Sequence, residues 1–154
     1  MGRLSLLSKG QNSKETASKA LLVFPSISCY YINVRIFKNK WFHRFADKEG
    51  ITDGELKEVV KQLESGQFYA DLGGSVYKME LARKGEGKHG GYRVLVFFKF
   101  EERVFFHYGF PKSVLGNISQ KELKIIKKQA KASFVQSDEH IEKQLANGTL
   151  YEII

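Results

Sequence analysis

The sequence predicts an α+β fold: an antiparallel sheet with an N-terminal helical hairpin, a C-terminal helix, and the helices on one face of the sheet. Three observations lead to this fold class. Two segments with apolar residues at helical spacing follow a first strand-like segment, three strand-like segments then occur in succession, and a helical segment comes after them. Strands that follow one another without intervening helices favour an antiparallel sheet over an alternating α/β architecture.

The first three elements are a strand and two helices. Apolar and polar residues alternate over residues 32–37, which predicts a strand. Aromatic side chains recur at helical spacing over residues 40–48, which predicts a helix. Thr52, with Glu55 three residues later, forms a capping box, and Gly66 marks the end of the helix that this box opens.

The later elements follow from turn signals and alternation. Residues 71–74 have the composition of a turn, and the short charged segment 101–103 is expected to join two strands as an antiparallel hairpin. Ser119 and Glu122 form a second capping box. The remaining strands are expected at 76–82, 92–100, 104–110 and 149–153, and the remaining helices at 120–134 and 138–146.

Residues 1–33 differ in composition from the rest of the chain. They are rich in Ser, Lys and Gly and show no sustained helical or strand period. The apolar run 20–24 is short and stops at Pro25, so we do not expect a secretory signal. We divide the chain into an extension over 1–33, interpreted as a disordered tail or as residues upstream of the true start, and a folded domain over 34–154.

Composition limits the class of protein. The 154 residues include 25 Lys and Arg against 17 Asp and Glu, a net charge of +8. The single cysteine, Cys29, excludes an intramolecular disulfide framework and a zinc site of several thiolates. No run of about 18 apolar residues is present, so we expect a soluble, cytoplasmic protein without a membrane partner. The charge points to a polyanionic partner, either a nucleic acid or an acidic protein.

A basic, glycine-rich loop lies between two of the expected strands, over residues 83–93. Its glycines permit close backbone approach, and its cations could neutralise phosphates. A solvated hairpin loop is the alternative. Residues 85–90 also fit G-x-G-x-x-G, but no helix follows them, which excludes a Rossmann-type phosphate site.

Other site chemistries find little support. The four histidines, His43, His89, His107 and His140, include no i, i+4 pair, so a metal site is not expected. His107 is interpreted as a structural side chain at the end of a strand. No Gly-x-Ser-x-Gly motif is present, and acyl-transfer chemistry is therefore not indicated.

The helix expected at 120–134 carries two stripes of side chains. A solvated amphipathic face is the simpler interpretation of its lysines, and a supporting surface for nucleic acid is the alternative. The apolar stripe consists of Leu123, Ile126, Ala130 and Phe134, and the basic stripe of Lys121, Lys124, Lys128 and Lys131.

Six short segments form a series of motifs along the domain. They are residues 37–51 (FKNKWFHRFADKEGI), 71–74 (DLGG), 88–93 (KHGGYR), 108–112 (YGFPK), 117–119 (NIS) and 122–123 (EL). In order and spacing they resemble the RelE/ParE superfamily of type II toxins, and the HigB-like, RelE-type branch most closely. The resemblance covers residues 34–154.

The resemblance implies a small α+β toxin that cleaves messenger RNA, usually on the ribosome, and needs no metal or other cofactor. The ribose 2′-OH attacks the adjacent phosphate and leaves a 2′,3′-cyclic phosphate and a 5′-OH. It also implies a cognate antitoxin protein that silences the toxin, small and often with a helix-turn-helix. We expect that antitoxin to be acidic or amphipathic, because the domain is basic.

The resemblance also assigns roles to residues. Arg93 matches a strand arginine that holds phosphate in the family, and Lys78 matches the first lysine of the catalytic strand. We expect Arg93 and Lys112 on the scissile phosphate and Lys78 as charge stabiliser or proton shuttle. The residues expected to grip flanking RNA are Arg83, Lys84, Lys88 and His89.

Two departures from the family pattern keep alternatives open. Glu80 stands where RelE itself has a second lysine, and the segment that follows Lys112 in residues 111–115 lacks the acidic and basic residues often found there. One alternative is a ParE-like toxin that inhibits gyrase by binding. The other is a degenerate member that binds only its antitoxin or RNA.

Overall fold

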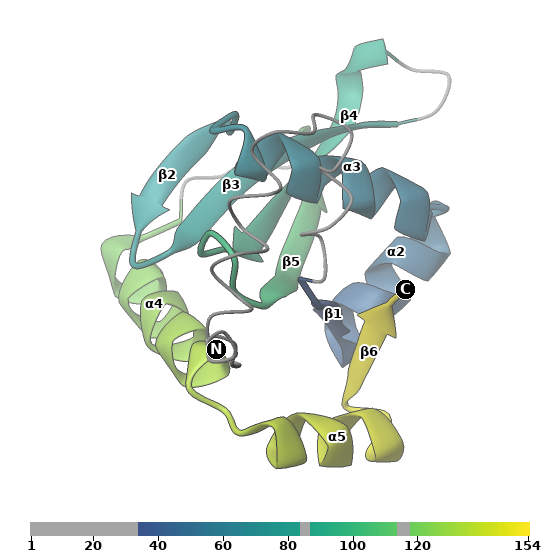
Figure 1. Cartoon of the computed structure of the whole chain (residues 1–154). Helices are drawn as coiled ribbons and strands as arrows, with labels where there is room; N and C mark the ends of the chain where they lie inside the picture. The colour runs from purple at the N-terminus through teal and green to yellow at the C-terminus, as the bar shows by residue number, and fades with distance from the viewer. Residues whose placement is uncertain (1–33, 84–86, 114–117) are drawn as a thin grey trace, which may run out of the picture. The chain divides into compact units, whose positions relative to one another are not determined.

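The computed structural model describes residues 34–83, 87–113 and 118–154, apart from the side chains of 87–89. The expected extension over 1–33 and its Cys29 therefore lie outside the described residues. The elements, shown in Figure 1, are β1 (Ile36–Asn39), α2 (Lys40–Glu49), α3 (Asp53–Glu64), β2 (Ala70–Gly73), β3 (Val76–Arg83), β4 (Gly87–Phe97), β5 (Val104–Pro111), α4 (Gln120–Phe134), α5 (Asp138–Asn147) and β6 (Leu150–Ile153).

The α+β class is confirmed, and one strand pairing differs from the expected antiparallel sheet. The six strands are ordered β2-β3-β4-β5-β1-β6. All neighbours are antiparallel except β1 and β5, which run parallel, with Phe37 opposite Phe105. Parallel strands need a long connection, and α2, α3 and the β2–β4 meander supply it.

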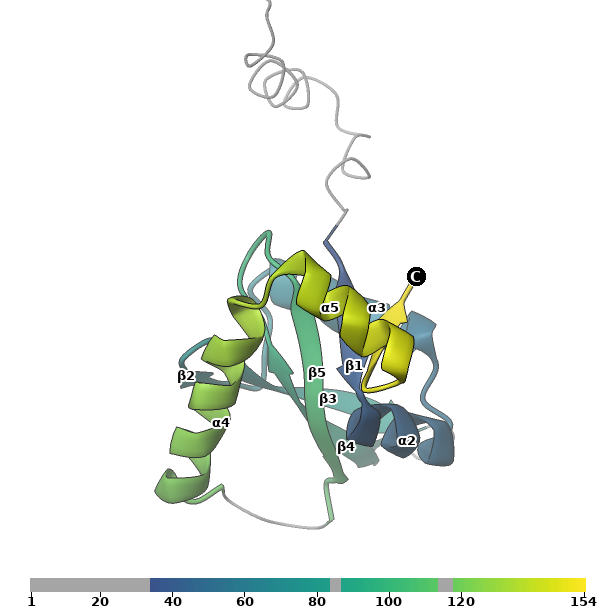
Figure 2. The same ribbon diagram turned by 90° about the horizontal axis from the view of Figure 1, so that it is seen from below.

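The helices cover both faces of the sheet, so the expectation that they share one face is wrong (Figure 2). Phe105 and Phe106 are consecutive in β5 and therefore point to opposite faces. Phe106 lies 5.3 Å from Phe42 of α2, whereas Phe105 lies 5.9 Å from Phe134 of α4, between ring centroids. Hence α2 packs on one face and α4 on the other.

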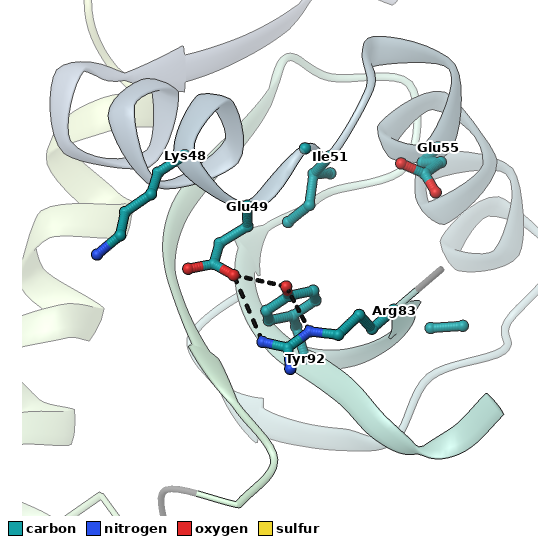
Figure 3. A pocket seen from close by; sticks show the side chains of 8 residues that line it. Lys48, Glu49, Ile51, Glu55, Arg83 and Tyr92 are labelled. Carbon is teal, nitrogen blue, oxygen red and sulfur yellow. Dashed lines mark hydrogen bonds and ion pairs between the residues drawn. The ribbon is translucent and has the colours of Figure 1, made fainter. Parts of the chain in front are cut away.

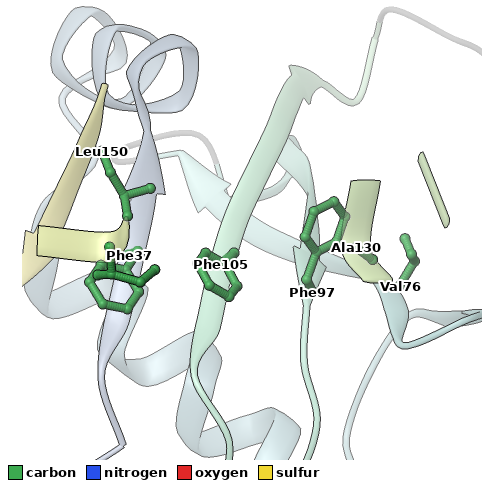
Figure 4. Packing of buried hydrophobic residues seen from close by; sticks show 7 residues of the cluster. Phe37, Val76, Phe97, Phe105, Ala130 and Leu150 are labelled. Atoms are coloured by element: carbon green, nitrogen blue, oxygen red, sulfur yellow. The ribbon is translucent and has the colours of Figure 1, made fainter. Parts of the chain in front are cut away.

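The face beneath α4 and α5 carries a row of buried apolar side chains. Figure 4 shows them crossing the sheet from β6 and β1 to β3 and α4. The cluster contains Phe37, Val76, Phe97, Phe105, Ala130, Ile141 and Leu150, with Ile126 and Phe134 packed against it. The predicted apolar stripe of α4 thus supplies part of the core, and burying each large side chain contributes about 1.5–3 kcal/mol to folding.

The predicted helix starts are confirmed at atomic detail. Thr52 accepts a hydrogen bond from the backbone N–H of Glu55, while the Glu55 carboxylate accepts one from the Thr52 N–H, which completes the capping box. Ser119 accepts from the Glu122 N–H, and its hydroxyl donates to the Glu122 carboxylate. Each such cap contributes about 1 kcal/mol.

Two segments were assigned wrongly from the sequence. Residues 71–74 were expected to form a turn, but residues 71–73 belong to strand β2. The register of β2 against β3 shifts between Asp71 and Gly73, and Gly73 has a φ of 88°. The chain therefore turns one step later, at Gly74–Ser75. Strand β4 begins at Gly87 and ends at Phe97, rather than spanning 92–100. Glycines in the basic loop therefore extend the β3–β4 hairpin instead of separating its strands.

In the described part of the chain, no helix combines the length and the apolar character that crossing a bilayer requires.

Candidate functional site

Three sequence-predicted cations, Lys78, Arg93 and Lys112, come from three successive strand regions of one sheet face. Glu80 lies opposite Arg93 in the β3–β4 ladder. Its Oε2 is 3.6 Å from Arg93 Nη2 and 3.5 Å from Lys112 Nζ. Lys78 points to the same face of β3, because side chains two residues apart along a strand share a face. We call Lys78, Glu80, Arg93 and Lys112 the cation cluster.

Tyr69, the residue immediately before β2, contacts Arg93 from the edge of the sheet. Its hydroxyl accepts a hydrogen bond of 3.0 Å from Arg93 Nη2, and the guanidinium carbon lies 4.4 Å from the ring centroid. Lys78 Nζ lies 5.9 Å from the same ring. A tyrosine against two cations contributes both a hydrogen bond and cation–π attraction.

The cluster is suited to bind an anion. Three cations share the sheet face with one carboxylate, so the net charge of the cluster is positive. Arg93 Nε is buried and has no hydrogen-bond partner among the described residues, so this donor of the guanidinium is not satisfied within the described fold. Arg93 and Lys112 are 28% and 17% exposed, and this partial burial strengthens their electrostatic effect relative to freely solvated side chains.

Gly91 sets the spacing between β4 and β3 next to Arg93. A Cβ on Gly91 would lie 2.3 Å from the carbonyl oxygen of Leu81, so only glycine permits the close approach of β4 to β3. The carbonyl of Gly91 also accepts a hydrogen bond of 2.9 Å from the Lys112 N–H. This contact secures the backbone of Lys112 beside the strand that carries Arg93.

Arg83, expected to grip RNA beside the cluster, lies on the opposite face of the sheet. Its Nε donates to the Tyr92 hydroxyl at 2.8 Å, and its Nη2 lies 3.5 Å from Glu49 of α2 (Figure 3). Glu49 also accepts a 2.6 Å hydrogen bond from Tyr92. Burial, together with the Glu49 carboxylate, raises the pKa of Tyr92. These residues line a pocket of about 420 Å³ under the end of α2.

The other predicted RNA-gripping residues cannot be placed as side chains. Lys84 lies outside the described residues, and so do the side chains of Lys88 and His89, whose backbone belongs to β4.

His107 has a structural environment. Asn39 Nδ2 donates to the His107 carbonyl at 2.9 Å, and the His107 ring stacks on Phe97 with 4.7 Å between centroids. Burial lowers the pKa of His107. Over residues 34–83, 87–113 and 118–154, no three His, Cys, Asp or Glu side chains gather as a metal site would require.

Sequence reasoning missed two members of the site. Tyr69 precedes a strand that was interpreted as a turn, so nothing indicated that its ring would reach Arg93. Glu80 was noticed as a departure from a pattern, yet its place between two cations follows from the β3–β4 register. An acidic residue facing a basic one in adjacent strands would have been the available signal.

A comparison with known families identifies the family of the chain. A comparison with curated protein sequences returned no match. A family model, described as the RelE toxin of the RelE/RelB toxin–antitoxin system, matches residues 34–153, which is most of the chain and every described helix and strand. The matched region includes the whole cation cluster and Tyr69. The chain therefore belongs to the RelE toxin family, and it is the toxin component of a toxin–antitoxin system.

Proposed function

We propose that this toxin is an endoribonuclease of the HigB-like branch that cleaves messenger RNA on translating ribosomes in the cytoplasm. The observation that carries the proposal is the convergence of Arg93 and Lys112 on the carboxylate of Glu80. Such a cluster can hold a phosphodiester through its cations and can also accept a proton. Both tasks are needed for attack by the ribose 2′-OH.

The first task falls to Arg93 and Lys112. A phosphate oxygen in the cluster would receive hydrogen bonds from the Arg93 guanidinium and from the Lys112 ammonium. Charge grows on the nonbridging oxygens as the pentacoordinate phosphorane forms, so these donors stabilise the transition state more than the bound substrate. Tyr69 acts as a positioning residue, because it holds the guanidinium from the side away from Lys112.

The second task is proton transfer, which we assign to Glu80 and Lys78. The Glu80 carboxylate takes the proton of the 2′-OH as the O2′–P bond forms. Lys78 gives a proton to the 5′-oxygen as the P–O5′ bond breaks, which yields a 2′,3′-cyclic phosphate and a 5′-OH. The two residues are two positions apart on β3, about 6.6 Å, a separation that suits groups acting on the entering and leaving oxygens.

Residues 34–154 constitute the toxin domain in this proposal, and residues 1–33 are an extension that the activity does not need. The family match, which begins at residue 34, supports this division. Deletion of 1–28 is expected to leave the melting temperature and the toxicity unchanged. A lowered melting temperature would assign part of the extension to the domain.

Mapping of RNA ends tests the proposed function. The purified protein is added to a translation reaction, and the 5′ ends of the messenger RNA are mapped after treatment that distinguishes 5′-OH from 5′-phosphate ends. We expect new 5′-OH ends within the translated region, absent when Arg93→Ala replaces the wild type. Cleavage that persists when translation is blocked would remove the ribosome from the proposal, while intact RNA would reject the nuclease.

Glu80 also favours a second candidate function, binding without cleavage. Its carboxylate forms ion pairs with Arg93 and Lys112, and in this second function it competes with phosphate for the two cations instead of acting as a base. The same preparation would then bind antitoxin or RNA without cutting. A gyrase supercoiling assay separates the third possibility, a ParE-like toxin, because only that class inhibits supercoiling.

A further inference from the structure

A second basic surface lies on α4, away from the cation cluster. Five lysines and Gly74 line a shallow groove of about 470 Å³, which we call the lysine groove. The five lysines are Lys99, Lys124, Lys127, Lys128 and Lys131. Gly74 belongs to the turn between β2 and β3, which α4 passes in Figure 1. None of the five ammonium groups forms an ion pair with an acidic side chain of the described residues, whereas Arg35, Lys38 and Arg103 do.

The fold holds these lysines in place. A Cβ on Gly74 would lie 2.9 Å from Lys127 Cγ, and one on Gly73 would lie 3.0 Å from Lys127 Nζ. The paired glycines thus make room for the Lys127 stem to cross the turn. Lys99 Nζ lies 4.8 Å from the centroid of Phe134. Lys127 is therefore packed on the glycine turn, and Lys99 is packed on the aromatic ring at the end of α4.

The charge pattern fits a phosphate chain. Lys124, Lys128 and Lys131 are exposed along one face of α4, and seven residues of helix span about 10 Å. A stacked nucleic-acid strand carries about one charge per 3.4 Å, so this length matches roughly three phosphates. Unpaired cations gathered in this way repel one another, and a polyanion would relieve that repulsion.

An acidic protein segment fits the groove less well. Peptide segments that dock in grooves draw affinity from apolar or aromatic anchors placed in pockets. The lining of this groove is one glycine and five lysines, whose apolar surface comes from side-chain stems, so no aromatic or branched side chain forms a pocket for such an anchor. Phosphate backbones are bound by charge of this kind irrespective of sequence.

We propose that the lysine groove binds the backbone of the substrate RNA strand several nucleotides from the phosphate held by the cation cluster. The inference rests on the proposed function only in taking RNA as the substrate. Val76, which packs with Ala130 of α4, and Glu80 lie on one face of β3, about 13 Å apart along the strand. At about 3.4 Å per stacked nucleotide, a strand crosses that distance in roughly four nucleotides.

Binding of RNA of two lengths tests the groove. The probes are 2′-O-methyl oligouridines of 3 and 12 nucleotides, which cannot be cleaved by 2′-OH attack, titrated against the full chain at several salt concentrations. The groove variant carries Lys124→Gln, Lys128→Gln and Lys131→Gln. It retains Lys127, because that side chain packs against Gly73 and Gly74. The control variant carries Lys48→Gln, Lys57→Gln and Lys61→Gln, which removes the same charge from exposed positions on α2 and α3.

For the 12-nucleotide probe, we expect the groove variant to lower the slope of log affinity against log salt by about 2, at about 0.7 per lost phosphate contact. The control variant should keep most of the wild-type slope, and the 3-nucleotide probe should not distinguish the two variants. Equal slopes for groove and control variants would overturn the proposal, as would a wild type that binds neither probe. A groove variant that binds RNA like the control and loses only its antitoxin would assign the groove to an acidic protein.

The result is independent of the nuclease test. A wild type that cleaves no messenger RNA yet binds the long probe through the groove would reject the nuclease and retain the groove. Cleavage of messenger RNA without groove-dependent binding would support the nuclease and reject the groove. Thermal melting of all three proteins is the control for folding.

Discussion

Glu80 and Arg93 face each other across the β3–β4 ladder, with 3.6 Å between carboxylate and guanidinium. The same carboxylate lies 3.5 Å from the Lys112 ammonium. One acid thus holds together two cations that would otherwise repel each other. In the proposed function, Glu80 either accepts the proton of the 2′-OH or competes with the phosphate for the two cations. Substitution of Glu80 distinguishes these two roles.

Glu80→Gln preserves the shape of the side chain and removes its ability to accept a proton. If Glu80 is the base, cleavage should fall by about 10²- to 10⁴-fold, and the ascending acid limb of the pH–rate profile should disappear. Single-turnover cleavage measured across pH tests this prediction. Equal or faster cleavage by the variant would instead identify Glu80 as a group that competes with phosphate for the cations.

Arg93→Ala should abolish growth arrest and lower cleavage by about 10²- to 10³-fold, the usual loss when one donor to a transition-state oxyanion is removed. Lys112 remains beside Glu80 in this variant, so the fold should keep its melting temperature. Arg44→Ala, an exposed arginine on α2, is the matched control and should remain toxic. A folded Arg93→Ala protein of full toxicity would show that the phosphate binds elsewhere.

Tyr69→Phe removes the hydroxyl that accepts from Arg93 and keeps the ring beneath the guanidinium. We expect kcat/KM to fall by about 3- to 10-fold, corresponding to one hydrogen bond. Tyr69 acts through Arg93, so the loss should vanish when Arg93 is already Ala, and a double-mutant cycle measures this coupling. Tyr151→Phe, on β6, serves as control. Additive losses would place Tyr69 in an independent role.

Gly91→Ala should destabilise the protein by about 3 kcal/mol, the upper end for overpacking, because its Cβ would lie 2.3 Å from the Leu81 carbonyl oxygen. Gly54→Ala provides the contrast. Its Cβ meets nothing nearer than 3.8 Å, and alanine favours the helix by about 1 kcal/mol. Chemical denaturation of both variants checks the prediction, and a Gly91→Ala protein as stable as the wild type would contradict the β3–β4 spacing.

His107 makes stability depend on pH. Burial lowers its pKa in the folded protein, so the unfolded chain binds the proton more readily. Its contribution is therefore complete above about pH 6.5, the usual unfolded value, and declines as the pH falls below it. Melting temperatures at pH 7.5 and 5.5 should differ more for the wild type than for His107→Gln. His140→Gln, an exposed position, should behave like the wild type.

Local elements were predictable from the sequence because their signals are local. The capping box at Thr52 and the apolar stripe ending at Phe134 depend on residues within one or two helical turns. The parallel pairing of β1 with β5 does not, since Phe37 and Phe105 are distant in the chain and either direction would have buried both. The hydrophobic pattern of a strand does not reveal which strand it pairs with or in which direction.

The site was predictable in part for the same reason. Arg93 stands out as a cation in an apolar strand, and Lys112 follows the next strand. Arg83 is also basic, but it lies three positions from Glu80 on β3, so its side chain points to the other face, where it contacts Tyr92 and Glu49. Alternation along the strand therefore separates Arg83 from Lys78 and Glu80, and the resemblance that grouped these cations did not take it into account.

The position of β1 between β5 and β6 bears on how the toxin is synthesised. Translation completes β1 about 65 residues before β5 begins, which at about 5–20 residues per second is roughly 3–13 s. During that interval Phe37 lacks the strand that covers it, although β3 and β4 can already join as a hairpin. A nascent chain therefore carries Lys78 and Arg93 before it has the complete sheet that holds them. Antitoxin already present in the cell has those seconds in which to meet the toxin before it is folded.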